Sequence, residues 1–348
     1  MNPIAIRMLS GQLASPQFRR AEEVVAWFGA MQAQEYQMMR WAVAMRTKRP
    51  SIQDFRRAFD EGHIIRTHLF RTTWQLVIAE DLRWMLDLCR EKNRRAINGF
   101  LKYYGDSISE QEYDRGCAAI ERYVGDHPDA TKEDITLALQ SAGIAGSPHH
   151  ISILIRRAEI DGIICNGRLS QGRENTYSLL NERVPTIGPS PSREEALALL
   201  ARKYFRSHAP ATEADFIWWS GLSAKDCRQA IGSIQSELHT TRFLNETYYI
   251  HSNSRTRGFR PGRVTLLPSY DEYLIAYKSR HIALAPQHTH YAHNTFGIFH
   301  PVVLIDGRVA GNWKMTGRGV STHFFDAEPS PDALSSEKAR YTDFIATV

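Results

Sequence analysis

The stretch that decides the fold is residues 131–180, which run TKEDITLALQ SAGIAGSPHH ISILIRRAEI DGIICNGRLS QGRENTYSLL. Thr131 stands before two acids, which is typical of a helix start capped by a hydroxyl. Ser147-Pro148 opens a second helix, since proline is tolerated in the first turn. Apolar residues at spacings of 3, 4 and 7 from Ile151 mark one face of that helix. With two short strands at 163–165 and 176–180, the order predicts a winged helix-turn-helix.

The same order of elements recurs between residues 190 and 252. Two predicted strands, 240–244 and 247–251, flank Asn245-Glu246, a tight hairpin connection. Three predicted helices precede them, and their expected N-terminal caps are Ser192, Thr212 and Ser223. Self-similarity of this kind favours an array of small units over one large domain.

The N-terminal stretch fits the same scheme less closely. Val24, Val25, Phe28 and Met31 form a helical stripe. Two further helices are expected over 35–46 and 51–60, and a strand pair is expected from Ile64-Ile65 and residues 73–78. We interpret this stretch as another winged unit.

We therefore expect an α+β fold with three tandem winged helix-turn-helix units and a small C-terminal β-rich cap. Alternating residues and turn signals between 295 and 326 favour the cap. The expected segments are a first winged unit at 1–80, a helical connector at 81–127, a second winged unit at 128–185, a third at 190–252, and a C-terminal β-rich region at 260–348.

The composition is that of an ordinary globular protein, with 43% hydrophobic and 23% charged residues. No apolar run approaches the ~20 residues that a membrane span needs. The four cysteines form no C-x-x-C pair and are expected to be buried and reduced. Three histidines between 288 and 293 have no neighbouring cysteine or carboxylate, so a solvated loop is expected there rather than a metal site. We expect a cytoplasmic protein, associated with the bacterial nucleoid when on DNA, without metal or cofactor.

Basic residues are unevenly placed, although the net charge is only +5. Residues 1–100 hold sixteen Lys or Arg against ten Asp or Glu. Such patches suit contact with phosphate, and solvated surface arginines explain them equally well. A second basic stretch is formed by Arg255, Arg257, Arg260 and Arg263. Candidate DNA-binding residues are Arg156 and Arg157 on the expected recognition helix and Arg168 and Arg173 on its wing.

The segment Gln32-Ala33-Gln34 follows the first helical stripe directly. Gln32 falls four residues after Phe28, so it would extend an apolar face with an amide. A buried amide without a partner costs about 1–3 kcal/mol, which some gain must offset. A glutamine that satisfies backbone groups at a helix end is the structural alternative. Since residues i and i+2 point about 200° apart on a helix, two amides facing one pocket require a helix end close to Gln34.

Four segments together resemble one known family, the crosslink-repair DNA glycosylases (AlkZ- and YcaQ-like proteins). The matching segments are Met31-Gln-Ala-Gln34 with Trp41-Ala-Val, residues 65–77 (IRTHLFRTTWQLV), residues 216–221 (FIWWSG) and residues 266–274 (LLPSYDEYL). They fall in the expected order and span most of the chain.

The resemblance implies tandem winged helices and removal of N7-alkylated guanine, including bases held in interstrand crosslinks. The catalytic motif of the family, Gln-x-Gln or Gln-x-Asp, maps onto Gln32 and Gln34. Alkylation at N7 makes the base a good leaving group without a general acid, so an amide that positions water suffices. This sequence departs from the family's common Arg-Gly-Thr-x-His pattern, because Thr72 replaces Gly and Gln75 replaces His.

Further candidates flank these motifs. Arg66 and Arg71 are expected to contact phosphate, with pairing to Asp60 or Glu61 as the alternative. The residues expected to line a cleft are Thr67, Thr73, Asp271 and Tyr273, and for Asp271 the alternative is the cap of a turn.

The sequence leaves three functions open. The first is a monofunctional glycosylase, acting as a monomer on double-stranded DNA. A bifunctional lyase is disfavoured because the nearest lysine downstream of the motif is Lys48. The second is a DNA-binding regulator that kept the scaffold without activity. The third is a protein-interaction scaffold, which would have no affinity for DNA.

Overall fold

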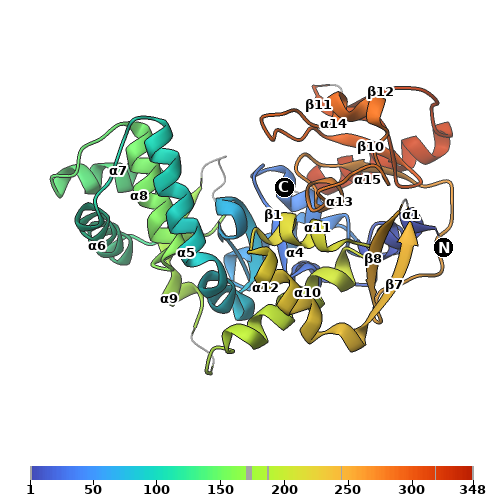
Figure 1. Ribbon diagram of the computed structural model, residues 1–348. Coiled ribbons are helices and arrows are strands. Elements are labelled where there is room, and N and C mark those ends of the chain that lie inside the picture. Colours follow the sequence, from blue (N-terminus) through green and yellow to red (C-terminus); the bar gives the residue numbers. More distant parts are fainter. Residues whose placement is uncertain (1, 170–174, 186–187, 244, 318, 347–348) are drawn as a thin grey trace. The chain divides into compact units, whose positions relative to one another are not determined.

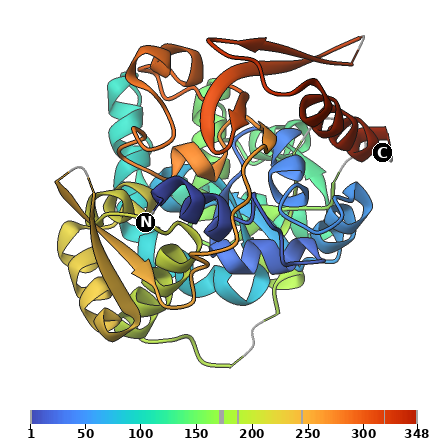
Figure 2. The same ribbon diagram turned by 90° about the vertical axis from the view of Figure 1, so that its right-hand side faces the viewer.

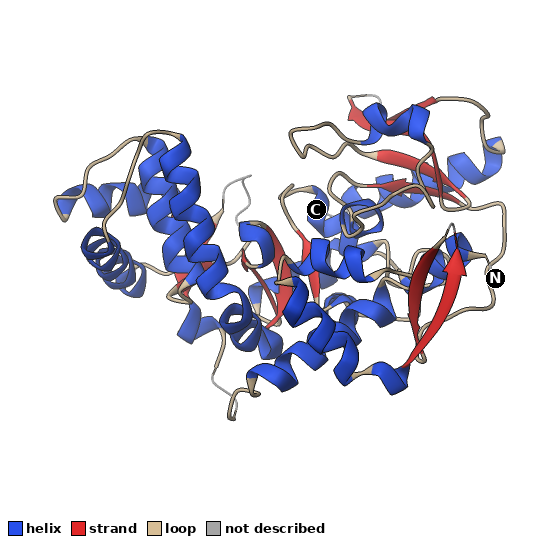
Figure 3. Ribbon diagram, viewed as in Figure 1, coloured by secondary structure: helices blue, strands red, loops and turns tan. Residues whose placement is uncertain are grey.

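The computed structural model describes residues 2–169, 175–185, 188–243, 245–317 and 319–346 (Figure 1). Helices and strands are mixed along the chain, which confirms the α+β class (Figure 3). Contacts divide the chain into two units: Met1–Phe55 with Leu197–Val348, here called the split unit, and Arg56–Ala196, the inserted unit. The predicted segment 1–80 spans the boundary between them, and the five predicted segments stay predictions. None of the described helices is both long enough and apolar enough to cross a membrane.

The inserted unit combines long helices with short antiparallel strands. Its elements are β2 (Ile64–His68), η1 (Phe70–Thr72), β3 (Trp74–Ile78), α5 (Ala79–Tyr103), α6 (Glu110–Asp126), β4 (Ala130–Thr131), α7 (Lys132–Ser141), α8 (Pro148–Ile160), β5 (Ile164–Asn166), β6 (Thr176–Leu179) and α9 (Leu180–Arg183). Strands β2 and β3 pair as a hairpin, and β4, β6 and β5 form a small sheet in that order.

The helix starts predicted in this unit are confirmed. The Thr131 hydroxyl accepts the backbone N–H of Asp134, whose carboxylate in turn accepts the N–H of Thr131, a reciprocal capping box. Ser147 caps α8 in the same way, with Pro148 in the first turn. The apolar face of α8 then packs into a core with α5, α6 and α7, in which Leu154 is fully buried.

The split unit begins the chain and resumes in α10. Its elements are α1 (Pro3–Ser10), α2 (Ala21–Phe28), β1 (Ala30–Gln32), α3 (Met38–Ala44), α10 (Arg193–Ser207), α11 (Glu213–Ser220), α12 (Ala224–Ser233), η2 (Gln235–Glu237), β7 (Leu238–Phe243), β8 (Glu246–His251), β9 (Val264–Leu267), α13 (Glu272–Ile275), η3 (Pro286–His288), α14 (Thr289–Ala292), β10 (Val302–Ile305), β11 (Arg308–Thr316), β12 (Gly319–Phe324) and α15 (Pro331–Ala346). Helix α4 (Ile52–Asp60) crosses the boundary between the units, and most of it lies outside the split unit. The predicted caps of α11 and α12, Thr212 and Ser223, are confirmed.

The C-terminal part contains an antiparallel sheet of order β12-β11-β10-β9. Helix α15 packs against β9 and was not predicted; it is the dark red helix of Figure 2. Trp41 of α3 joins the same core, where its ring contacts Tyr341 and Phe344 of α15. Helix α3, which follows β1 in the chain, is therefore packed against the C-terminal sheet and α15 through Trp41.

The predicted helical stripe through Met31 is wrong in its last step. Helix α2 ends at Phe28, and Gly29 adopts φ +83°, a conformation that side chains rarely tolerate. The chain then becomes extended as β1, which ends at Gln32. Gln32 therefore lies at the end of a strand and not on a helix.

Candidate active site

The two glutamines of the motif differ sharply in exposure. Gln32 is 5% exposed at the end of β1, whereas Gln34 is exposed where the chain bends two residues later. Because β1 is extended, the argument that i and i+2 diverge on a helix does not apply here. The Gln32 amide is thus fixed in the interior, and the Gln34 amide is open to solvent.

A buried carboxylate holds the backbone of Gln32. The Gln32 N–H donates to Oε1 of Glu272 at 2.5 Å. The other carboxylate oxygen, Oε2, accepts from Nε1 of Trp219 at 3.1 Å and lies 3.2 Å from Nε2 of His208. Glu272 is 4% exposed, so these partners replace the water that its charge has lost. Helices α13 and α11, together with His208 directly after α10, therefore fix the end of β1 through the Glu272 side chain.

The side chain of Gln32 is also held locally. Its Oε1 accepts the N–H of Ala33 at 3.1 Å, across a single peptide. This bond fixes the amide at the bend that presents Gln34. An amide at such a place can accept a hydrogen bond from water and donate another elsewhere.

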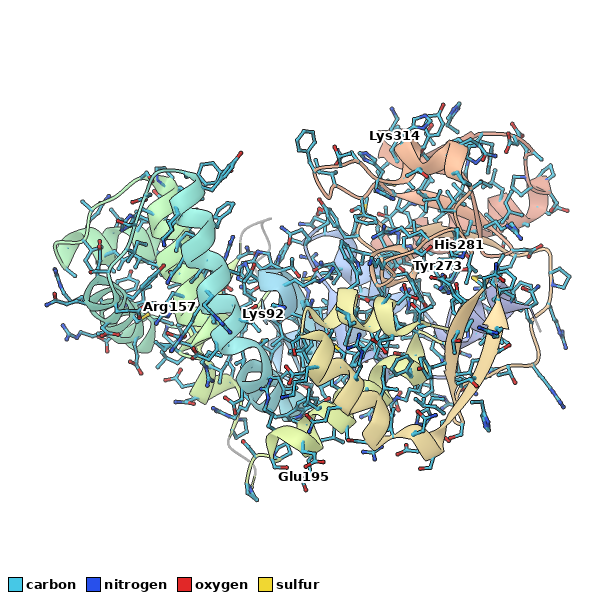
Figure 4. The ribbon with its side chains drawn as sticks, in the orientation of Figure 1. Lys92, Arg157, Glu195, Tyr273, His281 and Lys314 are labelled. Atoms are coloured by element: carbon cyan, nitrogen blue, oxygen red, sulfur yellow. The ribbon has the colours of Figure 1, made fainter. Side chains whose placement is uncertain are left out.

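A second buried carboxylate supports the same corner. Both oxygens of Asp271 accept from the Arg46 guanidinium, at 2.6 and 2.8 Å. Asp271 also caps α13 by accepting the N–H of Tyr273. Of the two predicted roles of Asp271, the structure shows the cap of a turn. The residue is only 3% exposed, so it does not line a cleft. Tyr273 is equally buried, and its hydroxyl donates to the Gly307 carbonyl, so its predicted place in a cleft is likewise corrected (Figure 4).

Sequence reasoning missed three residues of this arrangement. Trp219 and Glu272 lie inside the family-like segments 216–221 and 266–274, so the resemblance of these segments was the sequence signal that could have identified them. His208 lies outside the family-like segments. Its ring stacks on Tyr204 and makes an edge contact with Phe28, and the sequence alone predicts neither contact. Three of the four family-like segments therefore converge on Gln32, Trp219 and Glu272 in the split unit.

The inserted unit contains a buried polar cluster of its own. Nδ1 of His68 lies 2.7 Å from Oε2 of Glu159, and both side chains are almost fully buried. Burial lowers the pKa of His68 well below its ordinary value, and the charges of Arg156 and Arg66 act in the same direction. Burial also raises the pKa of the Glu159 carboxyl. Thr67, predicted to line a cleft, is fully buried with its hydroxyl 3.4 Å from Glu159.

Comparison with known proteins decides the family. The model of the family described as "DNA glycosylase AlkZ-like" matches residues 25–344. The chain belongs to the AlkZ-like DNA glycosylase family. Family members of this description hydrolyse N-glycosidic bonds in DNA.

Two matches to this AlkZ-like chain, one to a curated sequence and one to a solved structure, come from Streptomyces sahachiroi. An interstrand DNA cross-link repair glycosylase is 27% identical over 188 residues, which are 51% of this chain and 50% of the relative. The chain thus matches about half the length of that curated relative. The solved structure of the DNA glycosylase AlkZ has a TM-score of 0.80 and 20% identity, covering 99% of this chain and 96% of the other. At that identity the likeness shows the fold.

The loop that departs from the family's common pattern is tightly folded. Arg71 and Thr72 both have positive φ, +60° and +55°. Thr73 is half-buried and donates to the Phe70 carbonyl. Gln75, which replaces the family's histidine, donates from Nε2 to that same carbonyl. Its buried Oε1 has no hydrogen-bond partner among the described residues.

The six arginines predicted to bind DNA have different surroundings. Arg66 is 1% exposed, stacks on Trp74, and donates to Asn166 and Asn175 rather than to Asp60 or Glu61. Arg157 is 3% exposed and paired with Glu110 and Asp161. Burial thus leaves neither guanidinium a face for phosphate, which corrects those two predictions. Arg71 and Arg156 are partly exposed, Arg168 is well exposed, and Arg173 lies outside the described residues.

The part of the chain that the structure describes contains no cluster of side chains that could bind a metal ion. No three His, Cys, Asp or Glu side chains come together there as ligands. In the histidine-rich segment, His288 is buried with its ring tilted against Phe325, and the His290 ring is tilted against Tyr291. These rings therefore take part in aromatic packing.

Proposed function

We propose that this AlkZ-like chain is a monofunctional DNA glycosylase that excises N7-alkylguanine and unhooks interstrand crosslinks in double-stranded DNA. The observation that carries the proposal is the end of β1, where Glu272 holds the Gln32 backbone and Gln34 is exposed two residues later. The relative from Streptomyces sahachiroi, an interstrand DNA cross-link repair glycosylase, supports the substrate class.

The proposed chemistry needs little acid–base strength from the protein. N7 alkylation gives the base a positive charge, so the bond from C1′ to N9 breaks as that charge is neutralised, and the sugar becomes a cation. Water then attacks C1′ and loses a proton. Gln32 and Gln34 would orient this water, since a preorganised dipole is already aimed where charge develops. A neutral amide is too weak a base for unmodified nucleosides, which favours labile lesions.

Winged-helix units would present the chain to the duplex as a monomer. In the inserted unit, β4 is followed by α7 and α8 and then by β5 and β6, and in the split unit α10, α11 and α12 precede the β7–β8 hairpin. Both orders match a winged helix, and we propose that the N-terminal elements make a third. Arg71, Arg156 and Arg168 remain our candidates for phosphate contacts, because Arg71 and Arg156 are partly exposed and Arg168 is exposed.

The decisive experiment measures base release from defined duplexes. One duplex carries N7-methylguanine and another a nitrogen-mustard crosslink, and abasic sites are cleaved with alkali. We expect release by the wild type and a loss of about 100-fold or more for Gln34→Ala, the usual size of an effect on positioned proton transfer. Gln111→Ala, which removes an exposed glutamine of α6, serves as the control and should act like the wild type.

A regulator would give the opposite pattern. Salt-sensitive duplex binding without release of either lesion would reject the glycosylase and favour the DNA-binding regulator. Absence of duplex binding altogether would favour the interaction scaffold. The replacement of the family's glycine and histidine by Thr72 and Gln75 makes this comparison necessary.

A further inference from the structure

The loop between α14 and β10 (Figure 1) carries an unusually exposed apolar tip at Phe296. The Phe296 side chain is 88% exposed, and Ile298 and Tyr291 nearby are 44% and 40% exposed. Each square ångström of apolar surface left in water forgoes about 25 cal/mol of burial energy. Two exposed apolar side chains on this loop, with a third on the preceding helix α14, therefore indicate a surface that meets a partner.

The turn that carries Phe296 is rigidly built. The Asn294 carboxamide oxygen accepts the N–H groups of both Phe296 and Ile298, at 3.0 and 3.1 Å. The backbone closes the same turn twice, from Gly297 to the Asn294 carbonyl and from Asn294 to the Ile298 carbonyl. Gly297 has φ +78°, which a side chain would strain. These bonds hold the tip outward instead of letting it fold onto the protein.

The base of the turn is anchored in the split unit. His293 and Phe299 form a β-bridge, and their rings stack at 5.1 Å. Phe299 is buried, and the Arg280 guanidinium lies 4.9 Å from its ring. The exposed tip therefore stands on a fixed support, which is what a side chain that must push into another molecule requires.

The surrounding sequence is almost free of negative charge. Between residues 278 and 325 there are five Lys or Arg and six His, and Asp306 is the single acid. Lys314, on β11, is exposed in the same C-terminal region (Figure 4). An apolar tip within such a cationic segment fits a polyanion with an apolar interior, which describes the stacked bases of a DNA duplex.

We propose that Phe296 is a wedge that inserts between neighbouring base pairs of the duplex, with Ile298 beside it. This inference rests on the proposed function, because it assumes that the substrate is DNA. Apolar wedges partly unstack a base step and bend the duplex, at a cost of a few kcal/mol per step that new contacts offset. A crosslinked base cannot leave the opposite strand, so opening the stack locally gives water access to its sugar without extrusion of the base.

The test reads unstacking and excision separately. A duplex with 2-aminopurine beside a lesion analogue that cannot be cleaved reports unstacking by a rise in fluorescence on binding, at fixed salt. The same sequence with N7-methylguanine reports excision. We expect Phe296→Ala to abolish the fluorescence rise and to slow excision about tenfold or more. Phe296→Trp, which keeps a large ring, should retain both.

A matched control removes another exposed aromatic side chain. Tyr103→Ala deletes a ring that is 83% exposed at the end of α5, and it should leave both readouts unchanged. Because both residues are exposed, melting temperatures should stay at the wild-type value, which shows that the variants fold.

The outcomes separate this inference from the proposed function. If the wild type excises the base and Phe296→Ala matches it in both readouts, the wedge is refuted and the glycosylase stands. If the wild type binds and unstacks the duplex in a Phe296-dependent way without excision, the wedge stands and the glycosylase fails. If Phe296→Ala and the wild type bind duplex without any fluorescence rise, or neither binds, the wedge is refuted.

Discussion

At the scale of single residues, the backbone at Arg71 and Thr72 is the clearest strain in the described chain. Both residues have φ near +60°, in the left-handed region. For an L-residue this conformation costs roughly 1–2 kcal/mol, and a β-branched side chain makes it worse. Strain of this kind persists where surrounding structure enforces it, and it is common at functional sites. Thr72 stands where the family pattern has glycine, which would be free of the strain.

We therefore expect Thr72→Gly to stabilise the protein by about 0.5–1 kcal/mol. The relief of left-handed strain exceeds the extra entropy that glycine gives the unfolded chain. Urea titration measures the change. The control is Thr136→Gly in the middle of α7, where the same substitution should destabilise by about 0.3–0.5 kcal/mol, because glycine is a poorer helix former than threonine. Equal signs for the two variants would contradict the strain argument.

The buried His68 gives a pH-dependent contribution to stability. Its folded pKa lies well below the ordinary histidine value of about 6.5 because of burial and the charges of Arg156 and Arg66. Below pH 6.5 the unfolded chain therefore binds a proton that the folded chain does not, and this contribution is lost as the pH falls. It is fully present above that pH.

Replacing His68 tests the sign of this effect. The stability of the wild type relative to His68→Gln should increase as the pH rises from about 5 to about 7, by up to about 1.4 kcal/mol per pH unit. The raised pKa of Glu159 acts in the opposite direction in both proteins, so the comparison largely removes it. His63→Gln, at a half-exposed position, is the control. A difference that is flat with pH would refute the assignment.

At the scale of elements, the buried pair of Arg46 and Asp271 links the end of α3 to the start of α13. The ions are 0% and 3% exposed, so removing one leaves the other uncompensated in the interior. We expect Asp271→Asn to destabilise the protein by about 3–5 kcal/mol in urea titration. Excision should also slow, since α13 carries the carboxylate of Glu272 that holds Gln32.

Two comparisons make this prediction specific. Replacing both partners, with Arg46→Met and Asp271→Leu, should recover most of the lost stability, because no buried charge is then left unpaired. Arg228→Met breaks an exposed pair with Glu213 and should cost less than about 1 kcal/mol. Similar losses at the buried and exposed pairs would show that burial is not the cause.

The elements also show what sequence can and cannot predict here. Caps such as Thr131 and Ser147 depend on neighbours within three residues, so they were predicted correctly. Met31 continues the spacing of the α2 stripe, but the helix ends before it, at Phe28. Gly29 directly after Phe28 is a common signal for a helix end, and it would have predicted this boundary from the sequence. The bond between Gln32 and Glu272 joins residues 240 positions apart. No periodicity encodes such a contact, and only the fold brings the two segments together.

At the scale of the whole molecule, the two units have hydrophobic cores of their own. One cluster runs from Ile97 to Tyr177 in the inserted unit. Another combines residues from Ile4 to Ile52 with residues from Tyr248 to Phe344 in the split unit. Chains with more than one core commonly depart from two-state unfolding. The cysteines are well placed to test this, because three lie in the inserted unit and Cys227 lies in the split unit.

We expect thiol labelling in urea to show two midpoints. Cys89, Cys117 and Cys165 are buried, and burial raises the pKa of each thiol to about 12, so none should react in the folded protein. As urea increases, these three should become reactive together when the inserted unit opens, and Cys227 at a separate midpoint. Pulse labelling followed by peptide mass spectrometry assigns each thiol, with fully denatured protein as the reference. A single midpoint for all four would mean that the two units unfold as one cooperative structure, and reaction of any one thiol before urea would contradict its burial.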